Sequence, residues 1–101
     1  MVARQRKNME IGYSIHFHPA VAIEDIPKLD GSWKENIKKS IRTKLIINPE
    51  LFGSPLRQSL KGLRKLRVGD YRVIYQIKEK KVLIIMIGHR SVVYKVISKR
   101  I

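Results

Sequence analysis

Five basic residues in the C-terminal half have the types and spacing needed to bind phosphate. They are Lys61, Lys65, Arg67, Arg72 and Arg90. Guanidinium and ammonium groups on a rigid sheet can clamp a phosphate and stabilise the charge that accumulates during phosphoryl transfer. Runs of charge usually face water, however, so a plain solvated sheet surface is the alternative interpretation.

The histidines offer little conventional acid–base or metal chemistry. His89 lies near the basic cluster in sequence, whereas His16 and His18 fall on the polar side of an alternating segment. The absence of acidic residues beside them argues against a metal site. Because the chain has no cysteine, thiolate zinc sites and a cysteine nucleophile are excluded. We expect neither a metal nor a cofactor.

Two tyrosines could serve packing or chemistry. Tyr75 alternates with core positions, which favours packing. Tyr94 follows the Gly88-His89-Arg90 segment, where its ring could stack on a base or its hydroxyl could orient a proton acceptor. Core packing is an equal alternative for Tyr94.

Charge and length limit the class of protein. The 101 residues suit one domain, and the formal net charge of +14 predicts an anionic partner: nucleic acid, a ribonucleoprotein or an acidic protein. The longest apolar run, Val82 to Gly88, is far too short to span a membrane, and no secretory signal is present. We therefore predict a cytoplasmic protein without a membrane partner.

The N-terminal half is predicted to be mainly helical. Residues 1–10 are polar and basic and suggest a mobile arm, before a single domain over residues 11–101. Tyr13 to Phe17 alternates as a half-buried strand, and a short or kinked helix containing Pro27 follows over Ala20 to Leu29.

A longer helix is predicted next. Ser32 is expected to cap it, with Glu35 completing a capping box. An apolar residue then recurs every fourth position at Trp33, Ile37, Ile41 and Leu45. Residues 49–55 are expected to form a loop.

The C-terminal half predicts a hairpin and a buried strand. Gly69-Asp70 separates two strand-like runs, so Val68 should pair with Tyr71, Arg67 with Arg72 and Lys65 with Ile74. Lys65, Arg67 and Arg72 then share one face, and the other face should be core. Val82 to Ile87 is apolar throughout, as in a strand buried on both faces. Ser91 to Ile101 favours a short helix, with a strand as the alternative.

The fold class predicted from these elements is α+β. An N-terminal strand and a helical hairpin should pack on a small antiparallel sheet of about four strands.

The stretch from Leu66 to Ile77, LRVGDYRVIYQI, followed by an apolar strand, Gly88-His89-Arg90 and Tyr94, resembles the C-terminal half of RelE/ParE-superfamily toxins. The resemblance covers roughly residues 13–100. It implies a toxin held inactive by an acidic or amphipathic segment of an antitoxin protein, which would cover the basic face or displace a C-terminal element. In the RelE branch it implies cleavage of mRNA in the ribosomal A site, so ribosome and mRNA are further expected partners.

The resemblance also implies roles for single residues. Arg72 would stabilise the transition-state phosphate, Arg90 would assist the leaving oxygen, and Lys65 would lower the cost of deprotonating the ribose 2′-hydroxyl. Tyr94 would stack on a base or orient a proton acceptor at the site. The residues expected to contact nucleic acid are Lys61, Arg64, Arg67 and His89.

One position departs from the pattern of the ribosome-dependent nucleases. Leu63 stands where these can carry a second lysine, with Lys61 expected two residues further back on the same strand face. The departure leaves two alternatives: a ParE-like inhibitor of DNA gyrase that acts by binding, and a catalytically degenerate toxin.

Overall fold

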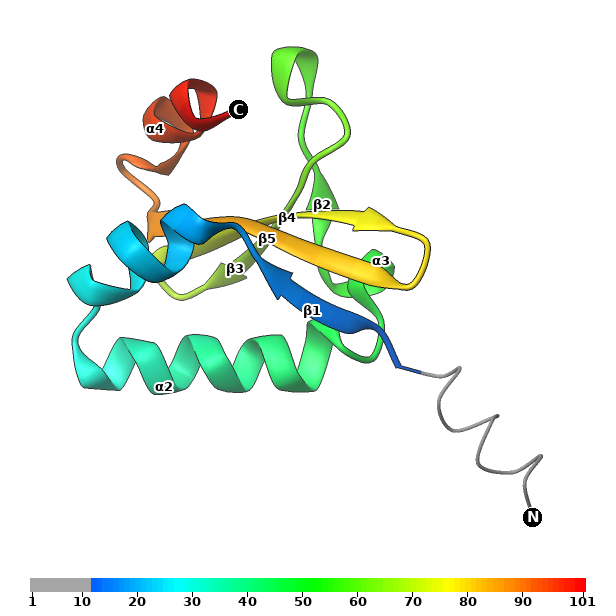
Figure 1. Ribbon diagram of the computed structural model, residues 1–101, viewed down its shortest axis with the longest axis horizontal. Coiled ribbons are helices and arrows are strands. Elements are labelled where there is room, and N and C mark those ends of the chain that lie inside the picture. Colours follow the sequence, from blue (N-terminus) through cyan, green and yellow to red (C-terminus); the bar gives the residue numbers. More distant parts are fainter. Residues whose placement is uncertain (1–11) are drawn as a thin grey trace.

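A five-stranded sheet forms the centre of the computed structural model, which describes residues 12–101 (Figure 1). The strands lie in the order β1-β5-β4-β3-β2. Their bounds are Ser14–Phe17 for β1, Ser54–Pro55 for β2, Arg64–Val68 for β3, Tyr71–Lys78 for β4 and Lys81–His89 for β5. The arm predicted over residues 1–10 lies outside the described residues.

The direction and number of strands differ from the prediction, although the α+β class is confirmed. β1 runs parallel to β5, with Ser14 opposite Lys81 and Phe17 opposite Ile84. Alternation of polar and apolar residues identifies a strand but carries no information about the direction of its neighbour. The additional strand, β2, has two residues and pairs with β3.

The predicted hairpin register is confirmed. Val68 pairs with Tyr71, Arg67 with Arg72, and Lys65 with Ile74. Gly69 occupies the turn with a φ of 59°, a left-handed conformation that glycine adopts without steric cost. The two-residue turn therefore fixes which side chains share a face of the sheet.

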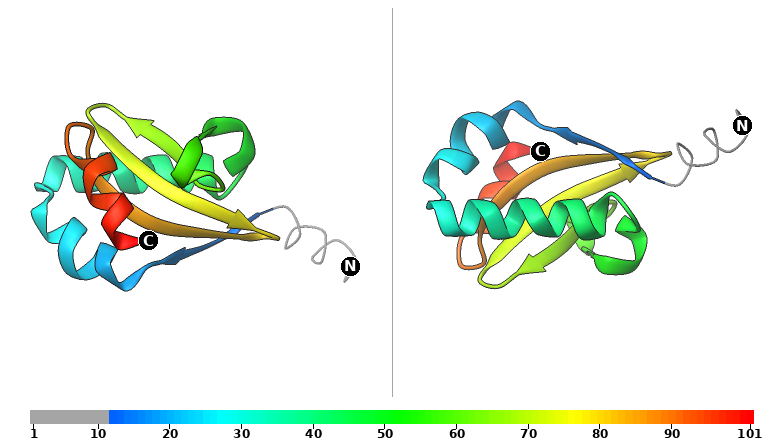
Figure 2. Two further views of the ribbon diagram at one scale, coloured as in Figure 1. Left: turned by 90° about the horizontal axis from the view of Figure 1, so that it is seen from above. Right: turned by 90° about the horizontal axis from the view of Figure 1, so that it is seen from below.

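Helices cover both faces of the sheet. Their bounds are Val21–Asp25 for η1, Ile26–Lys28 for η2, Gly31–Ser40 for α2, Ile41–Leu45 for η3, Pro49–Phe52 for α3, Gln58–Leu60 for η4 and Val93–Arg100 for α4. Figure 2 shows α4 lying across one face and α2 crossing the other. The first helical segment is short and changes its winding from η1 to η2 at Ile26, next to Pro27, in agreement with the predicted short or kinked helix. α4 confirms the helix favoured for residues 91–101.

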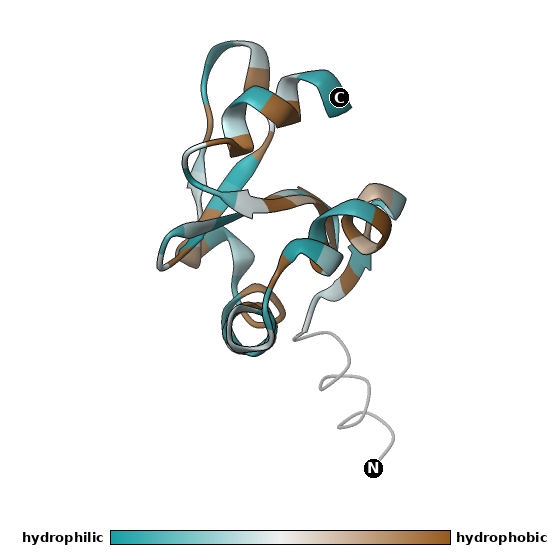
Figure 3. Cartoon of the chain, turned by 90° about the vertical axis from the view of Figure 1, so that its left-hand side faces the viewer, coloured by the Kyte–Doolittle hydropathy of each residue, from teal (hydrophilic) through white to brown (hydrophobic). Residues whose placement is uncertain are grey.

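The cap predicted for the long helix is wrong. Asp30, not Ser32, is the N-cap, and its carboxylate accepts a hydrogen bond of 3.0 Å from the backbone N–H of Trp33. Ser32 already lies inside the helix, which begins at Gly31. Asp and Ser cap helices about equally well, so residue type alone does not decide between neighbouring candidates. Figure 3 views α2 nearly end-on and shows hydrophilic and hydrophobic residues on this amphipathic helix.

The loop predicted for residues 49–55 contains a short helix and β2. The Asn48 side chain accepts a hydrogen bond of 3.2 Å from the N–H of Leu51, and Pro49 occupies the first helical turn. Proline suits that position because its missing N–H would have no partner there. The Tyr75 hydroxyl donates to the Pro49 carbonyl at 2.6 Å, which attaches α3 to the centre of the sheet.

The sheet is buried on both faces, so the prediction of one basic and one core face is partly wrong. The larger core lies between the sheet and α2 with η3; it includes Ile37, Leu45, Val73, Tyr75 and Ile84. A second core lies beneath α4 and comprises Leu63, Ile74, Ile85, Met86, Val93 and Ile97. The predicted double burial of Val82 to Ile87 is confirmed by the residues β5 contributes to both cores.

Candidate functional site

Lys65 and Tyr94 are brought together by β3 and α4. The Lys65 Nζ lies 5.7 Å from the centroid of the Tyr94 ring, within the range of a cation–π contact. Lys65 is half-buried on the α4 side of the sheet, and Tyr94 lies in the first turn of α4 above it. The contact holds a positive charge at a defined point, where it can stabilise an oxyanion that forms nearby.

Arg72 lies on the same face but is nearly buried, with 7% of its surface exposed. Its Nη1 donates to the carbonyls of Gly69, at 3.0 Å, and Tyr71, at 2.9 Å. Among the described residues these are the hydrogen bonds of its guanidinium, so the Nη2 and Nε edge is not used by the hairpin. Arg72 therefore supports the turn through Nη1, and its Nη2 and Nε could donate to a further acceptor.

Arg90 is placed beside the same turn by the end of β5. Its backbone N–H donates to the Asp70 carbonyl at 2.8 Å, and its Nε lies 3.8 Å from Asp70 Oδ1. Both side chains are about 60% exposed, at 61% and 60%. Such an exposed pair contributes about 0–1 kcal/mol, so a phosphate can displace Asp70 from the guanidinium.

His89 is oriented by the turn that follows it. Its Nδ1 accepts a 3.2 Å hydrogen bond from the Ser91 N–H and lies 2.8 Å from the Ser91 hydroxyl oxygen. A backbone N–H can only donate, so the proton of the neutral ring must reside on Nε2. His89 pairs with Tyr71, which places its side chain on the α2 face, away from Lys65. It can donate to a ligand from Nε2 but is poorly arranged to act as a base.

The residues predicted to contact nucleic acid do not all lie together. Arg67 is exposed and opposite Arg72, on the face of Lys65. Lys61 is exposed in a turn before β3, so its expected place on the strand face is wrong. The positive φ of Gly62, 96°, turns the chain before the strand begins.

Arg64 lies on the opposite face of the hairpin. Its Nη2 donates to the carbonyls of Glu50, at 2.7 Å, and Gly53, at 2.8 Å, while its Nε is buried without a hydrogen-bond partner. These contacts hold the segment containing α3 against β3. Burial raises the pKa of the neighbouring Tyr75 hydroxyl, and Arg64 partly offsets that rise. Arg64 thus has a structural role and does not join Lys65.

Sequence reasoning missed a buried ion pair between Asp25 and Arg100. Both side chains are nearly inaccessible, with 4% and 7% exposed. The hydrogen bonds that Arg100 donates to the Asp25 carboxylate raise the pKa of the Arg100 guanidinium, although burial opposes this effect. A signal was available, because Asp25 is spaced four residues from each of Val21 and Leu29 and so falls on the buried stripe of its helical segment.

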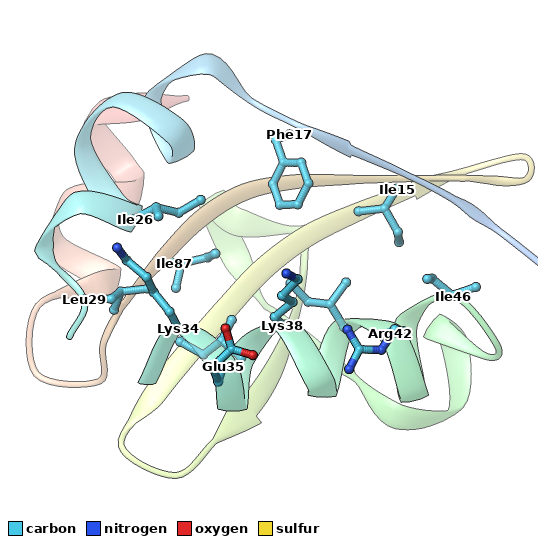
Figure 4. Close-up of a pocket in the computed structure, with 12 residues that line it drawn as sticks. Ile15, Phe17, Ile26, Leu29, Lys34, Glu35, Lys38, Arg42, Ile46 and Ile87 are labelled. Atoms are coloured by element: carbon cyan, nitrogen blue, oxygen red, sulfur yellow. The ribbon is translucent and has the colours of Figure 1, made fainter. Parts of the chain in front are cut away.

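It also missed a groove between β1 and α2. The groove has a volume of about 460 Å³ and apolar walls that include Ile15, Phe17, Ile26 and Ile37. Figure 4 shows Ile15 and Phe17 on β1 facing Lys38 and Arg42 on the helix side. Three cations, Lys34, Lys38 and Arg42, line its rim at four-residue spacing with Glu35 among them. This spacing was visible in the sequence.

Residues 12–101 lack both a cluster of metal-binding side chains and a membrane-spanning helix. No group of three or more His, Cys, Asp or Glu residues within 12–101 is arranged to hold a metal ion. No helix in the same range has the length and hydropathy needed to cross a membrane.

Comparisons with known proteins show which family the sequence resembles. A family model described as the ParE toxin of type II toxin–antitoxin systems, parDE, matches residues 15–94. Toxin RelE of Mycobacterium tuberculosis is 37% identical over 78 residues, which are 75% of this chain and 80% of that protein.

Solved structures share the fold. The chain is similar to a toxin–antitoxin complex, RelBE2, of M. tuberculosis, with a TM-score of 0.72, 29% identity and coverage of 80% of this chain and 94% of that chain. It is also similar to E. coli toxin RelE in complex with an antitoxin RelBc peptide, with a TM-score of 0.62. That likeness, at 24% identity over 83% of this chain and 93% of that chain, concerns the fold alone.

Proposed function

Because the chain belongs to the RelE/ParE superfamily of toxins from type II toxin–antitoxin systems, we propose that it is a ribosome-dependent endoribonuclease that cleaves mRNA in the A site and thereby inhibits translation. The observation that carries the proposal is the placement of four side chains along the α4 side of the β3–β4 hairpin and beside its turn. Lys65 contacts Tyr94, Arg72 lies diagonally across the β3–β4 pair, and Arg90 adjoins the turn.

These groups suit attack by a ribose 2′-hydroxyl on the adjacent phosphorus. The 2′-oxygen loses its proton to solvent or a ribosomal group and bonds to phosphorus. The bond from phosphorus to the 5′-oxygen breaks, and that oxygen takes a proton from solvent. The products are a 2′,3′-cyclic phosphate and a 5′-hydroxyl. Lys65 lowers the cost of the developing 2′-oxyanion, Arg72 and Arg90 neutralise the phosphorane and the leaving oxygen, and Tyr94 stacks on a base.

Leu63 limits the expected rate. It is 6% exposed in the core beneath α4, where a second ammonium would be desolvated and unpaired. Lys61 lies in the turn before β3 and so is not placed to supply this second ammonium group. We expect cleavage that depends on ribosomal groups for part of the proton transfer.

Gyrase inhibition by binding is the second candidate. It is favoured by the description of the matching family model and by Leu63. A ParE-like toxin would need the same fold but no catalytic Lys65, which gives the two functions different mutational signatures.

The antitoxin is proposed to bind the groove between β1 and α2. The groove has apolar walls and a cationic rim, so it fits an amphipathic segment with acidic residues beside Lys34, Lys38 and Arg42. Apolar burial would supply most of the affinity, and charge would accelerate association. The presence of antitoxin in complexes of similar fold supports this partner. Ribosome and message would place the protein in the cytoplasm.

The test adds purified protein to a translating ribosome mixture and maps mRNA ends by primer extension. Arg90→Ala removes an exposed side chain without opening the core, and Arg42→Ala removes the same charge from the opposite side of the sheet as a matched control. We expect A-site cuts with the parent and Arg42→Ala, loss of cuts with Arg90→Ala, and no cuts in naked RNA. Intact message in every sample, together with inhibited DNA supercoiling by gyrase, would overturn the nuclease proposal.

A further inference from the structure

The C-terminal end of α4 is fixed by a two-pronged ion pair. Arg100 Nη1 lies 2.7 Å from Asp25 Oδ2, and Arg100 Nη2 lies 3.0 Å from Asp25 Oδ1. The exposed Glu24 adds a longer contact of 3.3 Å to Nη2. The pair joins residues 75 positions apart in the chain, one at the end of α4 and one at the end of η1.

The same pair completes the hydrogen bonding of β5 where β1 ends. The last bond between those segments runs from the His18 N–H to the Ile84 carbonyl, at 2.8 Å. Beyond it, the Ile85 carbonyl accepts from Arg100 at 3.0 Å, and the Ile87 N–H donates to Asp25 at 2.9 Å. The ladder between β4 and β5 also shifts here, since Ile74 pairs with Met86 but Tyr75 with Ile84. The pair is therefore attached to an irregular point of the sheet.

The other attachments of α4 are apolar. It is 8 residues long, too short to be stable alone, and Val93 and Ile97 are fully buried while Tyr94 and Val96 pack partly buried against the same core. Apolar contacts are non-directional, so they define the rotation and tilt of a helix less sharply than hydrogen bonds do. Arg100 supplies directional contacts at the opposite end of α4 from Tyr94.

We infer that Arg100 and Asp25 are positioning residues for the proposed cleavage site: through α4 they set where the Tyr94 ring lies relative to Lys65. The inference rests on the proposed function only for its effect on cleavage. The placement of Tyr94 can be measured without RNA. The competing interpretation is that the pair affects stability alone, and buried ion pairs are by themselves weak evidence for stability.

Arg100→Lys is the informative variant. Lysine keeps a cation beside the Asp25 carboxylate, so the buried charge is still neutralised, but its single nitrogen does not reproduce the planar fork. It cannot reach both Asp25 oxygens and the Ile85 carbonyl in the geometry of Arg100. Lys99→Met, at an exposed position of the same helical turn, is the matched control.

Fluorine NMR of protein labelled with 3-fluorotyrosine reports the ring position. The chain has 4 tyrosines, and Tyr94→Phe assigns the relevant signal. We expect Arg100→Lys to shift or broaden the Tyr94 signal and to leave that of Tyr13 unchanged, whereas Lys99→Met changes neither. An unmoved Tyr94 signal in folded Arg100→Lys would overturn the inference.

Cleavage kinetics supply the second measurement. Arg100→Lys should lower kcat by about 10- to 100-fold with little change in KM, because a shift of about 1 Å in a side chain that positions the substrate has effects of that size. In a Tyr94→Ala background the same change should add almost nothing. An equal loss in both backgrounds would show that Arg100 does not act through Tyr94.

If Arg100→Lys does not fold, the pair Asp25→Asn with Arg100→Gln removes both charges together and is measured in the same two ways. An unmoved Tyr94 signal in that folded double variant would likewise reject the inference. A parent protein that leaves all message intact would reject the proposed function, while the fluorine signals would still decide the positioning role.

Discussion

The indole of Trp33 packs directly on Gly69 at the tip of the β3–β4 turn. A Cβ at Gly69 would lie 2.6 Å from Cη2 and 2.9 Å from Cζ3 of that ring. Trp33 also packs against Tyr71, with ring centroids 4.6 Å apart and the ring planes tilted by 49°. The first turn of α2 is thus packed against the β3–β4 turn that carries Asp70. The same β3–β4 turn orients Arg72, whose guanidinium donates to the Gly69 carbonyl.

Gly69→Ala should therefore lower the free energy of unfolding by about 2–4 kcal/mol, from left-handed backbone strain and the clash with the indole. Urea denaturation measures the change. Gly62→Ala is the control, because Gly62 also has a positive φ but open space around its Cβ position, and should lose only about 1–2 kcal/mol. Equal losses in the two variants would mean that Trp33 yields to the new methyl group.

A buried hydroxyl provides a prediction about alkaline pH. Tyr75→Phe leaves the Pro49 carbonyl without its donor and should cost about 1–3 kcal/mol near pH 7. Burial raises the pKa of Tyr75 above its ordinary value of 10.0, so the folded state retains the proton while the unfolded chain releases it. Stability from this group is therefore complete below about pH 10 and is lost as pH rises further.

The difference in the free energy of unfolding between the parent and Tyr75→Phe should consequently become smaller above about pH 10. Denaturant unfolding at several pH values measures this difference. Tyr13→Phe is the control, because it alters a half-buried tyrosine. Its free energy of unfolding should stay within about 0.5 kcal/mol of that of the parent near pH 7. A gap that remains constant up to high pH would contradict the assigned titration.

Arg64 and Arg67 are both arginines of β3, but their substitution should have opposite effects on stability and RNA binding. Arg64→Met removes hydrogen bonds to two carbonyls and should cost about 1.5–3 kcal/mol, with cleavage by the folded protein nearly unchanged. Arg67→Met should leave stability unchanged and weaken RNA binding, reducing the slope of log affinity against log salt by about 1. Thermal unfolding and RNA titrations at several salt concentrations separate the two. Weaker RNA binding by folded Arg64→Met would restore Arg64 to the nucleic-acid interface.

The hairpin and the long helix were predictable because local chemistry determines them. A two-residue Gly-Asp turn leaves one natural register, and a four-residue apolar period is a direct property of a helix. The grouping of Arg67 and Arg72 on one face followed from that register and was correct. The predicted cap, Ser32, was wrong because Asp30, two positions earlier, caps a helix about equally well and residue type does not favour either one.

Contacts between distant segments were not predictable from periodicity. The parallel direction of β1, the position of α4 over Lys65 and the Asp25–Arg100 pair depend on how the chain returns to the sheet. Arg64 shows the same limit: its charge suggested a ligand, but a carbonyl of α3 and one just beyond that helix are its partners. Charge identifies what a side chain can bind and does not identify which partner the fold brings to it.

Phe17 provides the sharpest test of the proposed antitoxin groove. It lines the groove from the edge strand β1, yet 47% of its surface is exposed, so Phe17→Ser should leave the fold intact. Loss of an aromatic anchor at an interface costs about 2 kcal/mol or more, so the product of a neighbouring antitoxin gene should bind at least about 30-fold more weakly. Isothermal titration calorimetry measures the affinity.

Ile23→Ser is the matched control, because Ile23 is 73% exposed and lies outside the groove lining. Arg42→Glu should slow association and do so most at low salt, since it reverses one charge of the rim. All three variants should retain the cleavage rate of the parent when no antitoxin is present. If Phe17→Ser and Ile23→Ser bind the antitoxin equally well, the groove is not its docking site, and the basic face around Arg67 becomes the surface to test next.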